Sequence, residues 1–283
     1  MASIAAALAA LSLAGVASPE SFAPGEEALF EVRYLNVVAG EARIAVGRPE
    51  GSIWPVFFQA RTRGVAGLVD VREHLVSYWD VKSRLPRGSE LRAFEAGDLH
   101  VDRSRFDRQR GKATWVRERK GRRSERTFDV PEGAHELTSA FLWLRLQPLA
   151  PGDRHELPIL SGRRQFSLVA EVRGREEVET PAGRFPCVRV DVQLPIAGRM
   201  STRGAVALWL TDDPRHVLVR LEAPFSVGEV VGVLTRYSPG TVIHGARRSG
   251  GQPPRAVAGR SSERASQRRP VASWSAPASA STD

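Results

Sequence analysis

The side chains best suited to acid–base chemistry come closest together at Asp70, Glu73 and His74. Residues four apart in a strand share a face, so Asp70 and His74 could approach each other while Glu73 points away. A carboxylate beside an imidazole is a pair that general acid–base catalysis uses. A solvated polar cluster is the simpler interpretation, because Glu73 faces away from the other two side chains.

Other chemical motifs are weak. The six histidines form no HxH or HExxH pattern, and neither a GxSxG motif nor a phosphate-binding glycine loop occurs. Asp212 and Asp213 are adjacent oxygen donors of the kind that bind hard cations. Because Pro214 and Arg215 follow them, the pair is more typical of a turn. We therefore predict no catalytic residue, no metal ligand and no cofactor.

Cys187 is the only cysteine of the chain. A single cysteine excludes a disulfide within the chain and a cluster of thiolate metal ligands. Its position in a predicted strand favours a buried thiol that packs as a small apolar group over a reactive nucleophile.

Basic side chains are concentrated in a run of polar, strand-like segments between residues 103 and 126. They are Arg103, Arg105, Arg108, Arg110, Lys112, Arg117, Arg119, Lys120, Arg122, Arg123 and Arg126. One interpretation is a solvated sheet face that discourages edge-to-edge association. The other is contact with anionic lipid headgroups or polysaccharide, since clustered cations concentrate anions.

Two apolar segments would position a ligand. Residues 68–81 carry large apolar groups on both faces, which predicts a strand covered on both sides. Residues 139–147 (SAFLWLRLQ) predict a short buried helix, capped by Thr138 or Ser139 and ended by Pro148.

A curved sheet closed by such a helix offers an apolar cavity. The candidate ligand-binding residues are aromatic groups of these two segments and the first two arginines of the basic run: Trp79, Phe141, Trp143, Arg103 and Arg105.

The elements themselves are mostly strands. Val188, Val190 and Val192 alternate with polar residues, and the turn at Thr180–Gly183 precedes them. Residues 29–33 and 42–46 predict a hairpin that turns at 36–40. The pattern predicts a mainly β protein: one large antiparallel curved sheet, as a half-barrel or in two layers, with about 12 to 14 strands and one short buried helix. Trp209 is predicted to be buried in its C-terminal part.

Two segments of the C-terminal half resemble a known family. Residues 177–183 (EVETPAG) and 209–215 (WLTDDPR) are similar to the bacterial envelope family called domain of unknown function 3108. Residues 22–26 (FAPGE), 39–42 (AGEA) and 137–141 (LTSAF) with Leu144 and Arg145 fit the same order. The likeness runs from about residue 22 to residue 237. It implies an exported β-rich protein and brings no established catalytic residues.

Composition divides the chain into three parts. Residues 1–17 have the apolar length and the small residues, Gly15 and Ala17, of a signal peptide, although a basic start is missing; an Ala-rich helix that stays attached is the alternative. Residues 22–237 form the antiparallel β domain. Residues 244–283 are rich in Gly, Ser, Pro and Arg and predict a disordered basic tail.

The net charge of +9 is concentrated in that tail, which holds seven arginines and two acidic residues. The body of the chain is only mildly basic, so nucleic acid is not expected as a partner. No later segment is long and apolar enough to cross a bilayer in the mature chain.

The sequence therefore predicts a non-catalytic exported protein in the periplasm or cell envelope of a Gram-negative bacterium, holding a lipid or other amphipathic ligand in its curved sheet. The first alternative is a structural or interaction protein that docks an envelope protein or glycan. The second is a hydrolase that uses His74 and Asp70. The ligand, the partner and the oligomeric state stay open.

Overall fold

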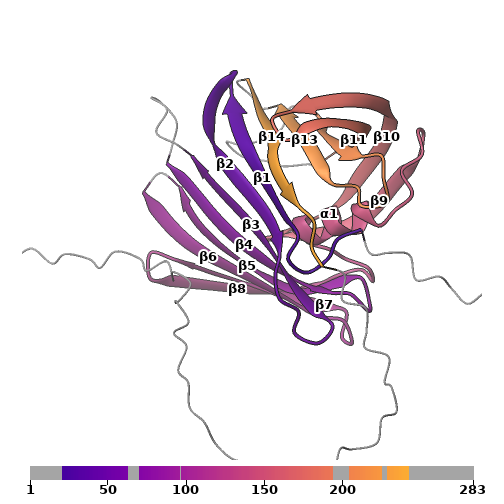
Figure 1. The fold of residues 1–283 in the computed structure, drawn as a ribbon. Coiled ribbons are helices and arrows are strands. Elements are labelled where there is room, and N and C mark those ends of the chain that lie inside the picture. Colours follow the sequence, from indigo (N-terminus) through magenta and orange to yellow (C-terminus); the bar gives the residue numbers. More distant parts are fainter. Residues whose placement is uncertain (1–20, 63–69, 96, 194–203, 225–227, 242–283) are drawn as a thin grey trace, which may run out of the picture. The chain divides into compact units, whose positions relative to one another are not determined.

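The computed structural model describes residues 21–62, 70–95, 97–193, 204–224 and 228–241 (Figure 1). The predicted signal peptide (1–17) and tail (244–283) lie outside these ranges. The described strands are β1 (Glu27–Tyr34), β2 (Val37–Val46), β3 (Ile53–Thr62), β4 (Val71–Asp80), β5 (Leu85–Glu95), β6 (Asp98–Asp107), β7 (Lys112–Arg119), β8 (Arg122–Asp129), β9 (Arg154–Ser161), β10 (Arg164–Thr180), β11 (Gly183–Gln193), β12 (Val206–Thr211), β13 (Leu218–Pro224) and β14 (Glu229–Ser238). The helix is α1 (Leu137–Arg145).

The 14 described strands form one antiparallel sheet in the order β8-β7-β6-β5-β4-β3-β2-β1-β14-β13-β12-β11-β10-β9. Strands that follow each other along the chain lie side by side, except for β8 and β9, and β1 also pairs with β14 in the middle of the sheet. The two edges are therefore β8 and β9, and α1 lies between them in the sequence. The prediction of one large antiparallel sheet with one short helix is confirmed.

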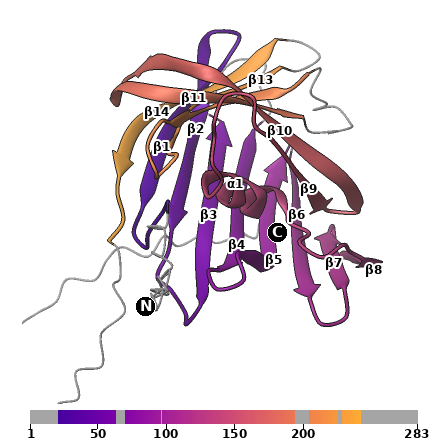
Figure 2. The ribbon, with the colours of Figure 1, turned by 90° about the vertical axis from the view of Figure 1, so that its right-hand side faces the viewer.

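The sheet curves around α1 (Figure 2). The helix contacts β4 and β5 on one side and β9 on the other, although β9 is the far edge of the sheet. A sheet of this size ordinarily curls or splits, because each strand is twisted against the next. Two hydrogen bonds connect β9 and β10 to the segment that runs from β8 to α1. The backbone N–H of Leu160 in β9 donates to the carbonyl oxygen of His135, before α1, at 2.8 Å. The side chain of Gln165 donates to the carbonyl oxygen of Asp129 at 2.9 Å.

Alternation along the strands fills the concave face with apolar groups. Val188, Val190 and Val192 of β11 point inward and are at most 5% exposed. They belong to the largest apolar cluster, together with residues of β9, β10, β12 and α1. Cys187 is also buried, as predicted, and burial raises the pKa of its thiol to about 12.

Trp209 of β12 is buried, which confirms its prediction. Its Nε1–H donates to the Glu176 carboxylate at 2.7 Å. The guanidinium groups of Arg189 and Arg220 lie 5.2 Å and 5.5 Å from the centroid of its ring. The indole is thus covered by arginine stems and cations, an arrangement in which cation–π attraction adds to apolar burial.

Three local predictions were wrong. Strand β4 is not covered on both faces: Trp79 is 1% exposed, whereas Tyr78 is 41% exposed, because α1 covers only the concave side. The cap of α1 is Glu136 rather than Thr138 or Ser139, since its carboxylate reaches the free N–H groups of the first turn. The first hairpin turns at residues 35–36, so that β2 already begins at Val37.

The basic strands β6 to β8 carry much of their charge on the convex face, where it is paired. Arg103 bonds Glu90 at 2.9 Å and Glu118 at 3.1 Å. Arg123 bonds Glu125 at 2.8 Å. The two Arg103 pairs cross from β6 to β5 and β7, whereas the Arg123–Glu125 pair lies within β8. Paired charges of this kind fit a solvated sheet face.

Candidate functional site

Helix α1 begins at a group of buried polar side chains. Oε1 of Glu136 accepts the N–H of Ser139 at 2.8 Å, and Oε2 accepts the N–H of Thr138 at 2.7 Å. The Ser77 hydroxyl of β4 donates to Oε1 of Glu136 at 2.5 Å. Burial raises the pKa of the Glu136 carboxyl, although these hydrogen bonds oppose the shift. The group attaches the start of α1 to the concave face of β4.

His135 joins this group from the residue before the cap. Its Nδ1 lies 3.1 Å from the Ser139 hydroxyl, and its ring lies 6.0 Å from Trp79 and 6.3 Å from Trp143. Burial, with the nearby charge of Arg108, lowers the pKa of His135 to about 4. The imidazole is therefore neutral near pH 7.

Serine, histidine and glutamate are the residue types of a hydrolase triad, but their roles here are structural. The Ser139 hydroxyl donates to the carbonyl oxygen of Glu136 at 3.0 Å, as in a helix cap. Ser139, His135 and Glu136 are all at most 5% exposed. A nucleophile needs a free approach for its substrate, and this hydroxyl is enclosed in the capping group.

The other end of α1 carries a buried arginine. Nη1 of Arg145 donates to the Glu26 carboxylate at 2.8 Å, and both side chains are at most 7% exposed. Its Nη2 donates to the carbonyl oxygens of Ser21 at 2.7 Å and Arg215 at 2.9 Å. The guanidinium lies 5.3 Å from the centroid of the Phe22 ring. Arg145 thereby joins α1 to the segment before β1 and to the β12–β13 turn.

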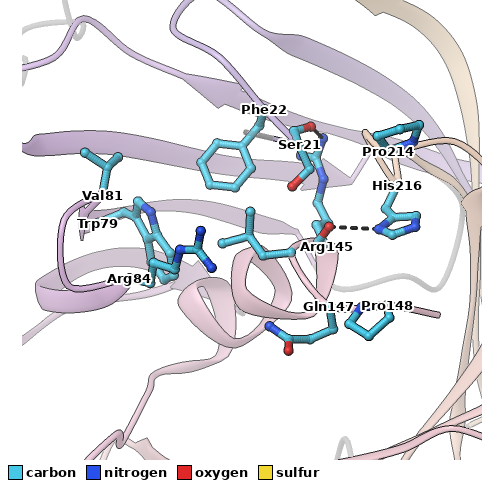
Figure 3. Close-up of a pocket in the computed structure, with 11 residues that line it drawn as sticks. Ser21, Phe22, Trp79, Val81, Arg84, Arg145, Gln147, Pro148, Pro214 and His216 are labelled. Atoms are coloured by element: carbon cyan, nitrogen blue, oxygen red, sulfur yellow. Dashed lines mark hydrogen bonds between the residues drawn. The ribbon is translucent and has the colours of Figure 1, made fainter. Parts of the chain in front are cut away.

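A cavity of about 440 Å³ opens beside this end of the helix (Figure 3). It lies within the size range of small-molecule sites, roughly 300–1,000 Å³. Four segments that are distant in sequence supply its walls: the residues before β1, the β4–β5 turn, the residues after α1 and the β12–β13 turn. The lining residues are Ser21, Phe22, Trp79, Val81, Arg84, Arg145, Leu146, Gln147, Pro148, Pro214 and His216.

The cavity is amphipathic. Its apolar wall contains Phe22 and Trp79, whose ring centroids lie 6.3 Å apart in an edge-to-face contact. Arg84 is exposed, and its guanidinium makes no hydrogen bond or ion pair with any residue in the described ranges; in Figure 3 it points toward the other lining residues. The hydroxyl of Ser21 is buried without a partner. The walls thus combine rings, one available cation and one unsatisfied hydroxyl.

His216 closes the same wall. Its Nδ1 lies 2.8 Å from the carbonyl oxygen of Arg145, so this nitrogen carries the proton and donates. Nε2 is then an acceptor in the neutral ring. His216 and Arg84 both have a left-handed backbone, with φ of 44° and 56°. The left-handed conformation costs more free energy for arginine than it would for glycine or asparagine.

Of the five predicted ligand-binding residues, only Trp79 lines this cavity. Phe141 and Trp143 are partly buried and pack against the apolar clusters on either side of α1. Arg103 and Arg105 lie on the convex face of β6, because Ser104 and Phe106 between and beside them point inward. The structure therefore does not bring the five residues together.

Sequence reasoning missed Ser21, Phe22, Arg84 and His216. The segment of residues 22–26 and Arg145 were noticed only as pieces of a family pattern. The order of these pieces along the chain indicated the family. However, no spacing in the sequence shows that the turn after β4 meets the turn after β12. Arg84 carried no local signal, because it follows the predicted strand of residues 68–81 and belongs to no predicted element.

The other chemical candidates occupy structural positions. Asp70 bonds Arg72 at 2.7 Å, and the His74 ring lies 6.1 Å from Phe57 on the convex face. Oδ1 of Asp213 accepts the N–H of Arg215 at 2.9 Å, as expected for a turn. Among the residues that the structure describes, no three His, Cys, Asp or Glu side chains are grouped to hold a metal ion.

In the described part of the chain, no helix has the length and apolar character needed to cross a bilayer. No curated protein is detectably similar in sequence to this chain. The family model described as "Protein of unknown function (DUF3108)" matches residues 29–235. The chain therefore belongs to this family, and the resemblance seen in its sequence motifs is confirmed.

One of the similar solved structures shares this architecture. A β-barrel-like protein of the domain of unknown function DUF1849 from Brucella abortus superposes with a TM-score of 0.54 at 10% identity, covering 77% of this chain and 98% of its own. A "putative lipoprotein" from Parabacteroides distasonis has a TM-score of 0.30 at 13% identity, covering 78% and 99%. A "putative exported protein" with a YmcC-like fold from Bacteroides fragilis has a TM-score of 0.30 at 13% identity, covering 77% and 98%.

Proposed function

We propose that this DUF3108 protein is a non-catalytic binding protein of the periplasm or cell envelope of a Gram-negative bacterium. It holds an anionic single-chain amphiphile, such as a long-chain fatty acid, in the cavity beside α1. The observation that carries the proposal is Arg84, a cation without a described partner at a cavity with an aromatic wall.

The backbone of Arg84 supports a role for its side chain. A non-glycine residue with φ of 56° is strained, and such strain persists where the side chain or the surrounding structure requires it. Arg84 makes no stabilising contact with a described carboxylate that would explain its presence. An anionic headgroup would supply the missing partner, and guanidinium groups bind carboxylates through two parallel hydrogen bonds.

The apolar wall supports an alkyl chain rather than a small polar anion. Phe22, Trp79, Val81 and Leu146 would cover a chain, and each buried methylene contributes about 0.8 kcal/mol. The unpartnered hydroxyl of Ser21 could bond a headgroup oxygen. The site would need no cofactor for this function.

The alternative of a docking protein for an envelope glycan has less support. It relied on the sheet surface and on the basic tail, and the tail lies outside the described residues. On the sheet, the two predicted ligand-binding arginines differ in their surroundings. Arg103 is held by Glu90 and Glu118, whereas Arg105 has no ion pair with a described residue. A hydrolase based on His74 lacks a described catalytic partner, because the Asp70 carboxylate bonds Arg72.

The test is calorimetric titration of the full chain with palmitate. The variant Arg84→Asn removes the cation, and asparagine tolerates a positive φ. We therefore expect the stability of the variant to be unchanged and its affinity for palmitate to fall roughly tenfold. Lys82→Gln is the matched control, because Lys82 is an exposed cation of the same turn that does not line the cavity.

Equal affinity in the Arg84→Asn and Lys82→Gln variants would refute the role of Arg84. Absence of binding to the unmodified chain would refute the proposed function itself. Cell fractionation of the producing bacterium tests the location, and recovery in the cytoplasm would contradict it.

A further inference from the structure

The tip of the β1–β2 hairpin exposes apolar side chains to solvent. Leu35 is 54% exposed, Val37 is 53% exposed and Val38 is 43% exposed. Only three other large apolar side chains in the described ranges are exposed, namely Tyr78, Leu99 and Leu137. Single exposed apolar residues are ordinary, but three of them within four residues indicate an interaction site.

The turn that presents these residues is strained. Tyr34 pairs with Val37, so the loop consists of Leu35 and Asn36, with φ of 48° and 64°. A two-residue loop with both φ values positive prefers Asn-Gly, and leucine is a poor residue for its first position. Turn geometry therefore does not explain Leu35. Its side chain lies over Gly228, where a Cβ would collide with it.

A cationic hairpin tip stands at the same end of the sheet. In an antiparallel sheet every second connection lies at the same end, which places the β1–β2, β5–β6 and β7–β8 tips together. The β7–β8 tip has four cations in five residues: Arg119, Lys120, Arg122 and Arg123. Lys120 and Arg122 form no ion pair with any residue that the structure describes.

The two tips lie at the same end of one sheet. Five strand spacings separate β2 from β7, which is about 25 Å along the sheet. Leu99, at the β5–β6 tip between them, is 59% exposed. This end of the sheet also carries acidic side chains. Asp98 is paired with Arg119, and Glu95 and Glu229 are exposed. The attraction for anions is thus concentrated at the β7–β8 tip. The β1–β2 tip stands at the top of Figure 1.

We propose that this end of the sheet docks on an anionic lipid bilayer, with Leu35, Val37 and Val38 inserted among the lipids and Lys120 and Arg122 on the headgroups. Apolar insertion combined with basic side chains is how peripheral proteins hold to anionic membranes. The surface lies at the opposite end of the strands from the cavity, which is formed around the β4–β5 and β12–β13 turns. The proposal does not depend on what the cavity binds.

A fluorescent label at the tip tests insertion directly. Val37→Cys in the full chain is labelled with nitrobenzoxadiazole. Cys187 is 1% exposed with a pKa of about 12, so it stays unlabelled. The control is the same label at Arg110→Cys, in the β6–β7 turn at the opposite end, where the side chain of Arg110 is 80% exposed. Both are mixed with phosphatidylglycerol–phosphatidylcholine vesicles and with pure phosphatidylcholine vesicles.

We expect blue-shifted emission only from the label at position 37 and only with phosphatidylglycerol. Lys120→Gln with Arg122→Gln should weaken vesicle binding by about 30-fold, or roughly fivefold per cation. Leu35→Asn should weaken it about tenfold, since a fully buried leucine contributes at least that much. The same Leu35→Asn change should not lower the unfolding temperature, because asparagine suits the turn.

Several results would overturn the proposal. They are no response at position 37, an equal response at both labels, and an equal response to both kinds of vesicle. A shift at position 37 that grows with protein concentration without vesicles would assign the tip to a second copy of the chain. A Leu35→Asn variant that loses stability and keeps vesicle binding would make Leu35 a purely structural residue.

Discussion

His135 shows how a single buried side chain links acidity to folding. Its ring lies between Trp79 and Trp143, next to the capping group of α1, and must stay neutral there. The cost of charging it reflects burial first and the positive charge of Arg108 second. Glu136 beside it has a raised pKa, so the two groups respond to pH in opposite directions.

The pH dependence follows from the sign of the His135 shift. The pKa of about 4 in the folded chain lies below the ordinary 6.5, so the unfolded chain binds the proton more readily. Stability from this group is fully present above pH 6.5 and is lost as the pH falls toward 4, by about 3 kcal/mol in total. Urea unfolding at several pH values should show this slope, and His135→Asn should remove it. An unchanged slope in His135→Asn would contradict the assignment.

Trp209 provides a prediction about packing. Trp209→Ala should lower the free energy of unfolding by about 3–5 kcal/mol, because it removes a buried aromatic group and leaves Glu176 without its donor. Asp213→Asn should cost much less, since asparagine can still accept the N–H of Arg215. Denaturant titration compares the two. A larger loss in Asp213→Asn would show that the Asp213–Arg215 ion pair dominates the turn.

At the scale of elements, β14 decides whether the sheet forms. It pairs with β1 over eight residues of each strand, and this pairing joins the N-terminal and C-terminal halves. The neighbouring contacts also matter: the N–H of Thr241 donates to the carbonyl oxygen of Pro24 at 2.9 Å. The described hydrogen bonds of this region therefore extend three residues beyond the end of β14, to Thr241.

Two truncations test this role. A chain ending at Ile243 keeps every described hydrogen bond, so we expect its unfolding temperature to match that of the full chain. A chain ending at Gly228 lacks β14 and leaves β1 and β13 with unpaired edges, so we expect no cooperative unfolding transition. Circular dichroism during heating measures both. A cooperative transition in the shorter chain would show that the two halves fold independently.

Sequence patterns predicted the elements well, for reasons that differ along the chain. Alternation in β11 was clear because one face meets the core and the other meets water. The motif at residues 39–42 has a steric basis: a Cβ on Gly40 would collide with the backbone of Arg61 in β3. Strand β4 misled because its apolar outer residues are exposed, and composition does not show which face α1 covers.

At the scale of the whole molecule, the sequence predicted little of the candidate site. Trp79 was identified because it is an aromatic residue of a segment that was predicted to be covered on both faces. Arg103 and Arg105 were placed with it because their strand was basic, yet a shift of one residue changes the face. The cavity depends on four turns and termini that meet only in the folded sheet, and local pattern carries no information about such meetings.

The pairing of β1 with β14 also sets the order in which the strands of the sheet can pair. Synthesis delivers the chain from its N-terminus, so β1 emerges about 200 residues before the strand that completes its hydrogen bonds. During that interval one whole edge of β1 is an open template for strands of other molecules. A chaperone that covers this edge would therefore protect the growing chain, and the need for it should end once β14 has been made.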